Sequence, residues 1–142
     1  MKRNKSVLLR LTAVLIGSAV ILAGLSAYVL TRQRTLRVTS YTWSGWEPFN
    51  EPEKTTDDHT VSIGEEIELP GVVFKDLKAR ILWVGSDSIT FTTSRPMSRS
   101  NNPGIDLRSD DRLFTVNKKE ELRLVTPSMD MGDVHIFELI DQ

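Results

Sequence analysis

The chain contains no cysteine. This absence excludes disulfide bonds, thiolate zinc sites and cysteine nucleophiles, so an exported domain would be stabilised by packing alone. Metal-ligand spacings, a phosphate-binding glycine loop and a dinucleotide-binding fingerprint are absent as well, and no cofactor is expected. The one Asn-x-Ser/Thr triplet lies at residues 4–6, so no glycosylation site is expected beyond the N-terminal tail.

Acidic residues are absent from residues 1–34, which carry six basic residues. Charge of either sign is absent from residues 11–30, LTAVLIGSAVILAGLSAYVL. A helix of this length rises about 30 Å, the thickness of the hydrocarbon core of a bilayer. The sequence therefore predicts one transmembrane helix that contacts the lipid bilayer through residues 11–30.

A cleaved signal peptide is the alternative to an uncleaved anchor. The apolar run is longer than the roughly 7–15 residues of a signal peptide, and a cut after Ala27 would place Leu25 where a small residue is required. We therefore favour a signal anchor.

Positive charge before the helix slightly exceeds positive charge after it, at Lys2, Arg3, Lys5 and Arg10 against Arg32, Arg34 and Arg37. This bias predicts a single-pass plasma-membrane protein with a cytoplasmic tail at 1–10 and an extracytoplasmic C-terminal domain. A cytoplasmic domain is the alternative.

Residues 35–142 carry twelve basic and nineteen acidic residues, a net charge of −7. Such a surface is unsuited to nucleic acid, which is bound by neutralising phosphates.

After residue 35 the apolar residues alternate in short runs and show no period of an amphipathic helix. This pattern is typical of half-buried strands. We expect an all-β fold, an antiparallel β-sandwich at 59–142, with a small barrel as the second choice. Residues 31–58 are expected to form a juxtamembrane strand and an aromatic and acidic linker.

The clearest local prediction is a hairpin, with strands at 79–84 and 89–91 joined by a turn at 85–88. Leu36 and Val38 predict a strand that follows the membrane helix. Residues 61–69 and 114–124 each predict two strands around a polar turn. Residues 134–140 are apolar on both faces, which indicates a strand covered on both sides.

Two segments repeat one pattern at a constant offset of 55 residues: TVSIGEEIEL at 60–69 and TVNKKEELRL at 115–124. A strand, a polar turn with glutamate and a second strand resemble the hairpins of immunoglobulin-like sandwiches, over about ten residues twice. The resemblance implies either pseudo-symmetric hairpins in two sheets or two uses of one turn.

Aromatic residues crowd residues 41–49, at Tyr41, Trp43, Trp46 and Phe49. Exposed rings of this kind stack on sugars or anchor a protein partner. The alternative is structural, since the rings could fill one end of the sandwich or lie at the membrane interface. We take these residues as the first candidate binding segment.

Residues 94–112 form a long polar segment with Arg95, Arg99, Arg108 and Arg112. A loop of this length is usually functional or mobile, and its arginines could receive an acidic partner or, alternatively, remain solvated. Asp106, Asp110 and Asp111 lie among them. A calcium site needs six to eight inward-facing oxygens and a sharply turned loop. No DxDxDG order is present, so local ion pairs are favoured and no metal is expected.

His59 and His135 are the only histidines, and the pattern around His135 predicts a neutral, hydrogen-bonded imidazole in the core. Ser128 with Asp130 or Asp133 could complete a hydrolase triad, but no nucleophile-elbow sequence accompanies them.

We therefore expect a non-enzymatic, membrane-anchored binding or accessory domain of a bacterial cell envelope, with an envelope or membrane protein as its partner. A carbohydrate-binding module is the second hypothesis, with a glycan on Tyr41, Trp43 and Trp46. A small hydrolase is the third.

Overall fold

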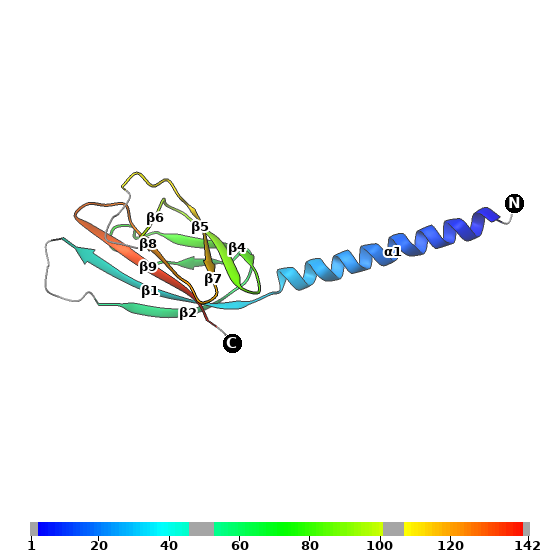
Figure 1. The fold of residues 1–142 in the computed structure, drawn as a ribbon, viewed down its shortest axis with the longest axis horizontal. Coiled ribbons are helices and arrows are strands. Elements are labelled where there is room, and N and C mark those ends of the chain that lie inside the picture. The colour runs from blue at the N-terminus through cyan, green and yellow to red at the C-terminus, as the bar shows by residue number, and fades with distance from the viewer. Residues whose placement is uncertain (1–2, 46–52, 101–106, 141–142) are drawn as a thin grey trace. The chain divides into compact units, whose positions relative to one another are not determined.

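The computed structural model describes residues 3–45, 53–100 and 107–140. The chain divides into two compact units, Met1–Arg32 and Gln33–Gln142. The first unit is a helix and the second is a β domain (Figure 1).

The helix α1 runs from Arg3 to Leu30. Its segment Arg10–Leu30 has a mean hydropathy of 2.2 and is long and apolar enough to cross a membrane, a property that N-terminal signal sequences share. The two serine hydroxyl groups within this stretch are satisfied by the helix itself. Ser18 donates to the carbonyl of Val14 at 2.8 Å, and Ser26 donates to that of Leu22 at 2.8 Å. Polar side chains bonded in this way are compatible with a hydrocarbon environment.

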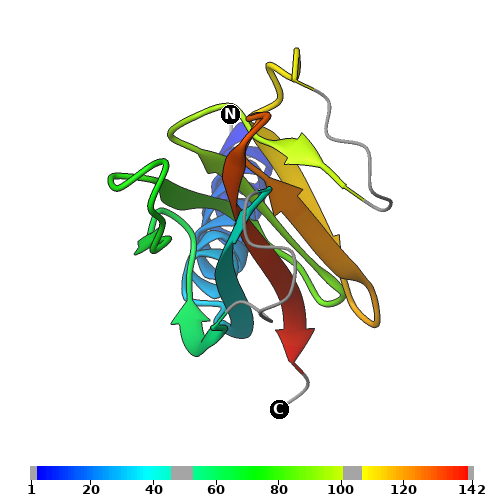
Figure 2. The same ribbon diagram turned by 90° about the vertical axis from the view of Figure 1, so that its left-hand side faces the viewer.

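The β domain consists of two antiparallel sheets, as the alternating pattern predicted (Figures 1 and 2). The larger sheet, called sheet A here, has the order β2-β1-β9-β8-β6. Sheet B has the order β3-β4-β5-β7. The bounds in sheet A are β1 Arg34–Ser44, β2 Thr55–Val61, β6 Ser98–Arg99, β8 Glu121–Val125 and β9 Met131–Ile140. Those in sheet B are β3 Glu66–Glu68, β4 Lys78–Val84, β5 Ser88–Thr93 and β7 Leu113–Asn117.

The domain begins well before residue 59, the boundary expected from the sequence. Residues 34–44 form β1, a central strand of sheet A that pairs with β2 on one side and with β9 on the other. The register with β9 runs from Thr35 opposite Ile140 to Ser44 opposite Met131. A strand paired along both edges belongs to the sheet, so residues 34–44 and 55–61 are part of the domain rather than a linker.

The predicted hairpin is formed by β4 and β5, which meet at Val84 opposite Ile89. The two other strand–turn–strand segments are not hairpins. The first leaves sheet A at β2 and enters sheet B at β3, and the second leaves sheet B at β7 and enters sheet A at β8. The sequence indicated the turns correctly, but an alternating pattern does not reveal which sheet a strand joins.

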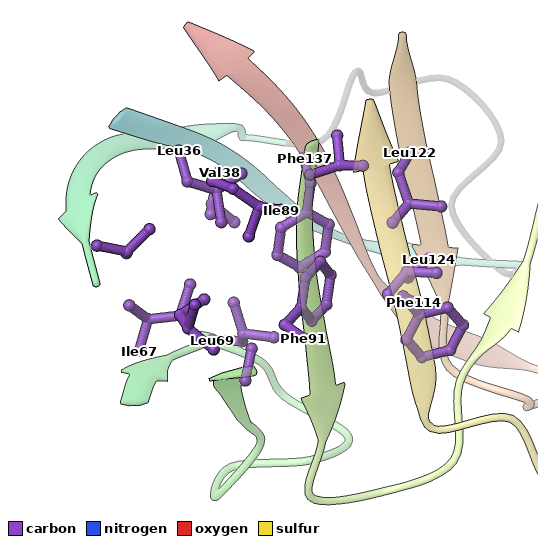
Figure 3. Packing of buried hydrophobic residues seen from close by; sticks show 14 of the residues in the cluster. Leu36, Val38, Ile67, Leu69, Ile89, Phe91, Phe114, Leu122, Leu124 and Phe137 are labelled. Carbon is purple, nitrogen blue, oxygen red and sulfur yellow. The ribbon is translucent and has the colours of Figure 1, made fainter. Parts of the chain in front are cut away.

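The core lies between the inner faces of the two sheets. Figure 3 shows Phe91 and Phe137 side by side, with ring centroids 4.7 Å apart, one from each sheet. Phe114 lies 6.0 Å from Phe91, centroid to centroid. Aliphatic side chains surround these rings, among them Leu36, Val38, Ile67, Leu69, Ile81, Ile89, Leu122 and Leu124. Apolar residues at alternate positions of each strand therefore account for the sandwich.

Parts of the long polar segment 94–112 are tied to the domain. Ser98 and Arg99 form the short edge strand β6, which pairs with β8. Met97 is wholly buried, and its carbonyl accepts a hydrogen bond of 2.8 Å from the Ser109 hydroxyl. The last strand is covered on both faces near Val134 and Phe137, which are both buried, whereas Ile136 and Ile140 on the outer face are only half-buried.

Candidate functional site

Tyr41 lies on the outer face of sheet A and is half-buried. Its hydroxyl accepts a hydrogen bond from the guanidinium of Arg123 on β8. Arg123 and Lys54 also lie against the ring, 5.7 Å and 5.5 Å from its centroid. The ring and the hydroxyl of Tyr41 are therefore engaged within the domain, by cation–π contacts and a hydrogen bond.

Trp43 lies on the same face, two residues further along β1, and pairs with Gly132 of β9. A Cβ atom added to Gly132 would lie 2.7 Å from the indole Nε1, so the ring rests on the glycine backbone. Trp46 and Phe49 lie outside the described residues. The structure thus places Tyr41 and Trp43 in intramolecular contacts, and their role in binding stays a prediction.

The arginines of the segment 94–112 do not converge on one point. Arg95 forms an ion pair of 3.1 Å with Asp76, in the connection between β3 and β4. The guanidinium of Arg99 lies 5.6 Å from the ring centroid of Phe114. Arg112 donates a hydrogen bond of 3.2 Å to the carbonyl of Ser94, and Arg108 is exposed and also takes part in a contact. Each of the four arginines thus takes part in a contact, and their role in binding an acidic partner stays a prediction.

Three exposed apolar side chains on the outer face of sheet B, two on β4 and one on β7 beyond β5, were not anticipated from the sequence. The pairing of β4 with β5 shifts between Ile81 and Trp83, which is a β-bulge. The bulge places two consecutive residues, Leu82 and Trp83, on the outer face, where their exposed fractions are 44% and 47%. Leu113 of β7 is 60% exposed on the same face. The sequence contains one signal of this exposure, the unbroken apolar run ILWV at 81–84. In a strand whose side chains alternate between two faces, the four cannot all point into the core.

His135 is fully buried on the inner face of β9, as its pattern predicted. Its Nδ1 atom lies 2.8 Å from the hydroxyl oxygen of Ser40 on β1, and its Nε2 atom has no hydrogen-bond partner among the described residues. Burial lowers the pKa of His135 to about 4, and the negative charge of Asp133 opposes this shift. The imidazole is therefore neutral at pH 7.

Asp133 is buried two residues before His135 on β9, on the same face of the strand. Its carboxylate accepts hydrogen bonds from the hydroxyl of Thr42 and from the backbone N–H groups of Val72, Val73 and Phe74, at 2.8 to 3.2 Å. These donors anchor the β3–β4 connection to sheet A. In a serine-hydrolase triad the acid orients the histidine, whereas here the carboxylate of Asp133 is bonded to Thr42 and to the backbone of residues 72–74. The hydroxyl in contact with His135 is that of Ser40, and the hydrolase hypothesis, with Ser128 and Asp130 or Asp133, stays a prediction.

A pocket of about 250 Å³ opens at one mouth of the sandwich. Its lining is Ser40, Tyr41, Thr42, Glu53, Thr55, Pro70, Gly71 and Val72. The pocket is therefore bordered by β1, by the start of β2 and by the connection between β3 and β4. No group of three or more His, Asp and Glu side chains that could hold a metal occurs within the described parts of the chain.

No protein-family model, curated protein or solved structure matches this chain.

Proposed function

We propose that this chain is a membrane-anchored accessory domain that binds another protein of the cell envelope through the outer face of sheet B. The observation that carries the proposal is the exposed group of Leu82, Trp83 and Leu113. Tryptophan is among the residues that contribute most to protein–protein binding, and exposed apolar groups rimmed by charge are typical of interaction sites. Arg80 and Glu66, a cross-strand pair, border this group on the same face.

The bulge in β4 supports the choice of this face. A regular strand would have turned one of Leu82 and Trp83 toward the core, whereas the bulge turns both outward. Bulges are found where a strand redirects a side chain for a purpose other than core packing. The indole of Trp83 also lies close to the chain at Gly85, because its Nε1 atom is 3.2 Å from where a Cβ atom would stand there.

The membrane helix supports the location. The residues Thr31–Gln33 alone separate α1 from β1. Because residues extend by at most about 3.6 Å each, this connection is far too short to serve as a long spacer. A partner in or on the same membrane is therefore the kind of protein that the domain would meet. The excess of positive charge before the helix supports an extracytoplasmic domain in the plasma membrane.

The proposal is tested by photocrosslinking from native membranes. A photoreactive residue replaces Trp83, Leu113 or Arg99, and replaces Lys119, which lies in an exposed turn, as the control position. We expect one recurrent envelope protein to be captured from positions 83 and 113 and not from 119. Capture from 99 would add the arginine segment to the interface. Scattered or purely lipid capture from all positions would contradict the proposal.

A matched pair of variants sharpens this experiment. Trp83→Ser removes the ring at the centre of the proposed interface, and Met129→Ser changes a side chain that is 76% exposed in the turn between β8 and β9. We expect the first variant to abolish capture from position 113 and the second to leave it unchanged.

A carbohydrate partner is the second candidate, supported by the row of side chains beside Trp83. Trp83 pairs with Thr90, and Thr90 pairs with Thr115, so that an indole and two hydroxyl groups lie in one line across the sheet. Sugars stack on aromatic rings and bond to hydroxyls. Retention of the wild-type chain, but not of Trp83→Ser, on purified cell-wall glycan would favour this candidate over a protein partner.

A further inference from the structure

The pocket at the mouth of the sandwich shares no residue with the face around Trp83, and its lining has a distinct chemistry. Ser40 and Thr55, a cross-strand pair of β1 and β2, contribute hydroxyl groups. Glu53 contributes a carboxylate. No lysine or arginine is found among its described lining residues, and Lys54, between Glu53 and Thr55, lies against the ring of Tyr41. The pocket therefore offers hydrogen-bond acceptors and a negative charge.

Strand β2 extends the acceptor surface beyond the pocket. Asp57 lies two residues after Thr55, so it projects from the same face of the strand. Both residues are exposed, whereas Val61 at the far end of β2 is buried in the core. The inner face of β2 thus changes from acidic and open near the pocket to apolar and closed.

A second negative charge lies directly behind the lining. The carboxylate of Asp133 is 1% exposed and is bonded to Thr42 and Val72, which themselves line the pocket. Its observed hydrogen-bond partners are neutral hydroxyl and N–H groups, and it takes no part in the ion pairs found among the described residues. A buried charge without an opposite charge is weakly screened, so its field extends into the pocket.

Gly71 keeps this carboxylate close to the pocket. A Cβ atom on Gly71 would lie 2.5 Å from Oδ2 of Asp133, so any other residue would push the connection away from the carboxylate. Gly71 therefore allows the backbone that lines the pocket to pass close to the carboxylate of Asp133.

Ser40 supplies a fixed acceptor at the base of the pocket. It is 5% exposed, and its oxygen is held 2.8 Å from Nδ1 of His135. A hydroxyl oxygen has one proton and two lone pairs, so at least one lone pair remains for a ligand whichever nitrogen of the imidazole carries the proton. The serine is thus positioned as an acceptor rather than free to rotate.

We infer that this pocket binds a primary ammonium group, carried either by a small free amine or by a lysine side chain. An ammonium group has three donors and no acceptor, which complements Ser40, Thr55 and Glu53. Its positive charge complements Glu53 and the buried Asp133. The volume of about 250 Å³ is below the range of about 300–1,000 Å³ typical of drug-sized ligands and suits a group the size of one side chain.

The inference is tested by calorimetric titration of the full chain in detergent micelles. The probes are 1,5-diaminopentane and 1,5-pentanediol, which share a carbon chain and differ in charge. We expect saturable binding of the diamine and none of the diol. Equal binding of the two probes, or no binding of either, would overturn the inference.

Two isosteric variants identify the site. Glu53→Gln removes the exposed carboxylate of the pocket, and we expect it to weaken diamine binding about fivefold, the effect of roughly 1 kcal/mol from an exposed charge pair. Glu121→Gln removes an exposed carboxylate on β8 that does not line the pocket, and it is expected to leave the affinity unchanged. Equal affinities of wild type and Glu53→Gln would place the amine elsewhere and overturn the assignment.

The source of the ammonium group is distinguished by a third probe, lysine blocked at its α-amino and carboxyl groups. Binding of both the blocked lysine and the diamine supports a lysine side chain presented by a partner. Binding of the diamine alone supports a small free amine.

Discussion

Gly64 and Lys119 occupy equivalent places in the two repeated segments, 55 residues apart, and both have positive φ, of 89° and 66°. In each turn, the backbone carbonyl two residues earlier accepts a hydrogen bond from the N–H group of the glutamate that comes next. Ser62 accepts from Glu65 at 3.3 Å, and Asn117 accepts from Glu120 at 3.1 Å. Each turn carries the chain from one sheet to the other, in opposite directions. The repeat is thus one turn used twice as an inter-sheet connection, and the interpretation as two hairpins is wrong.

These two turns lead to different responses to alanine. Gly64→Ala places a Cβ at φ 89°, and we expect a loss of about 1–2 kcal/mol in the free energy of unfolding. Lys119→Ala is the matched control, because the native residue already has a Cβ at positive φ, and its expected change is within about 0.5 kcal/mol. Chemical denaturation of the full chain in micelles measures both. Equal losses in the two variants would contradict this explanation.

The pKa of His135 predicts a pH dependence of stability. Because burial lowers this pKa from 6.5 to about 4, an unfolded chain binds a proton between these values and the native domain does not. The free energy of unfolding should therefore fall as the pH drops from 6.5 to 4, by about 3 kcal/mol in total. His135→Gln should remove this slope, which unfolding curves at several pH values would measure.

Asp58 provides a control with a different pH window. A bidentate hydrogen bond from Arg37 lowers the pKa of Asp58 below its ordinary value of 3.8. Its contribution is present above that value and is lost as the pH falls further. Asp58→Asn should therefore change only the most acidic part of the curve. If His135→Gln kept the wild-type slope between pH 6.5 and 4, another group would be responsible for it.

Asp133→Ala should destabilise the domain by at least about 3 kcal/mol. The change leaves a hydroxyl and three backbone N–H groups without their acceptor and releases the β3–β4 connection from sheet A. Asp130→Ala, at an exposed position of the β8–β9 turn, is the control and should change stability by no more than about 0.5 kcal/mol. Thermal unfolding followed by near-ultraviolet circular dichroism distinguishes the two. Similar midpoints for both variants would show that the carboxylate does not anchor the connection.

The contact of Trp43 with Gly132 predicts a compensating pair. Gly132→Ala places a methyl group 2.7 Å from the indole Nε1 and should cost about 1–3 kcal/mol. Adding Trp43→Ala removes the clash, so the double variant should lose less stability than the sum of the single variants. Gly45→Ala, whose Cβ would lie 3.4 Å from a carbonyl oxygen, is the control and should be tolerated. Additive losses at 43 and 132 would show that the two residues do not interact.

The sequence by itself determined those features that depend on neighbouring residues. Twenty uncharged residues specify a helix that can cross a membrane, and the apolar runs on either side of the turn at 85–88 specify a hairpin, because both signals lie within a few residues. The buried state of His135 followed from the apolar residues on its own strand.

The tertiary structure alone decided which distant segments meet. Pairing β1 with β9 brings Ser40 to His135, 95 residues away, and places Trp43 against Gly132, whereas the bulge in β4 exposes Trp83. Local periodicity cannot encode these outcomes, because it assigns a side chain to one of two faces and leaves open what lies against that face. The partner strand is chosen by the packing of the whole core, and the placement of the candidate sites depends on that choice.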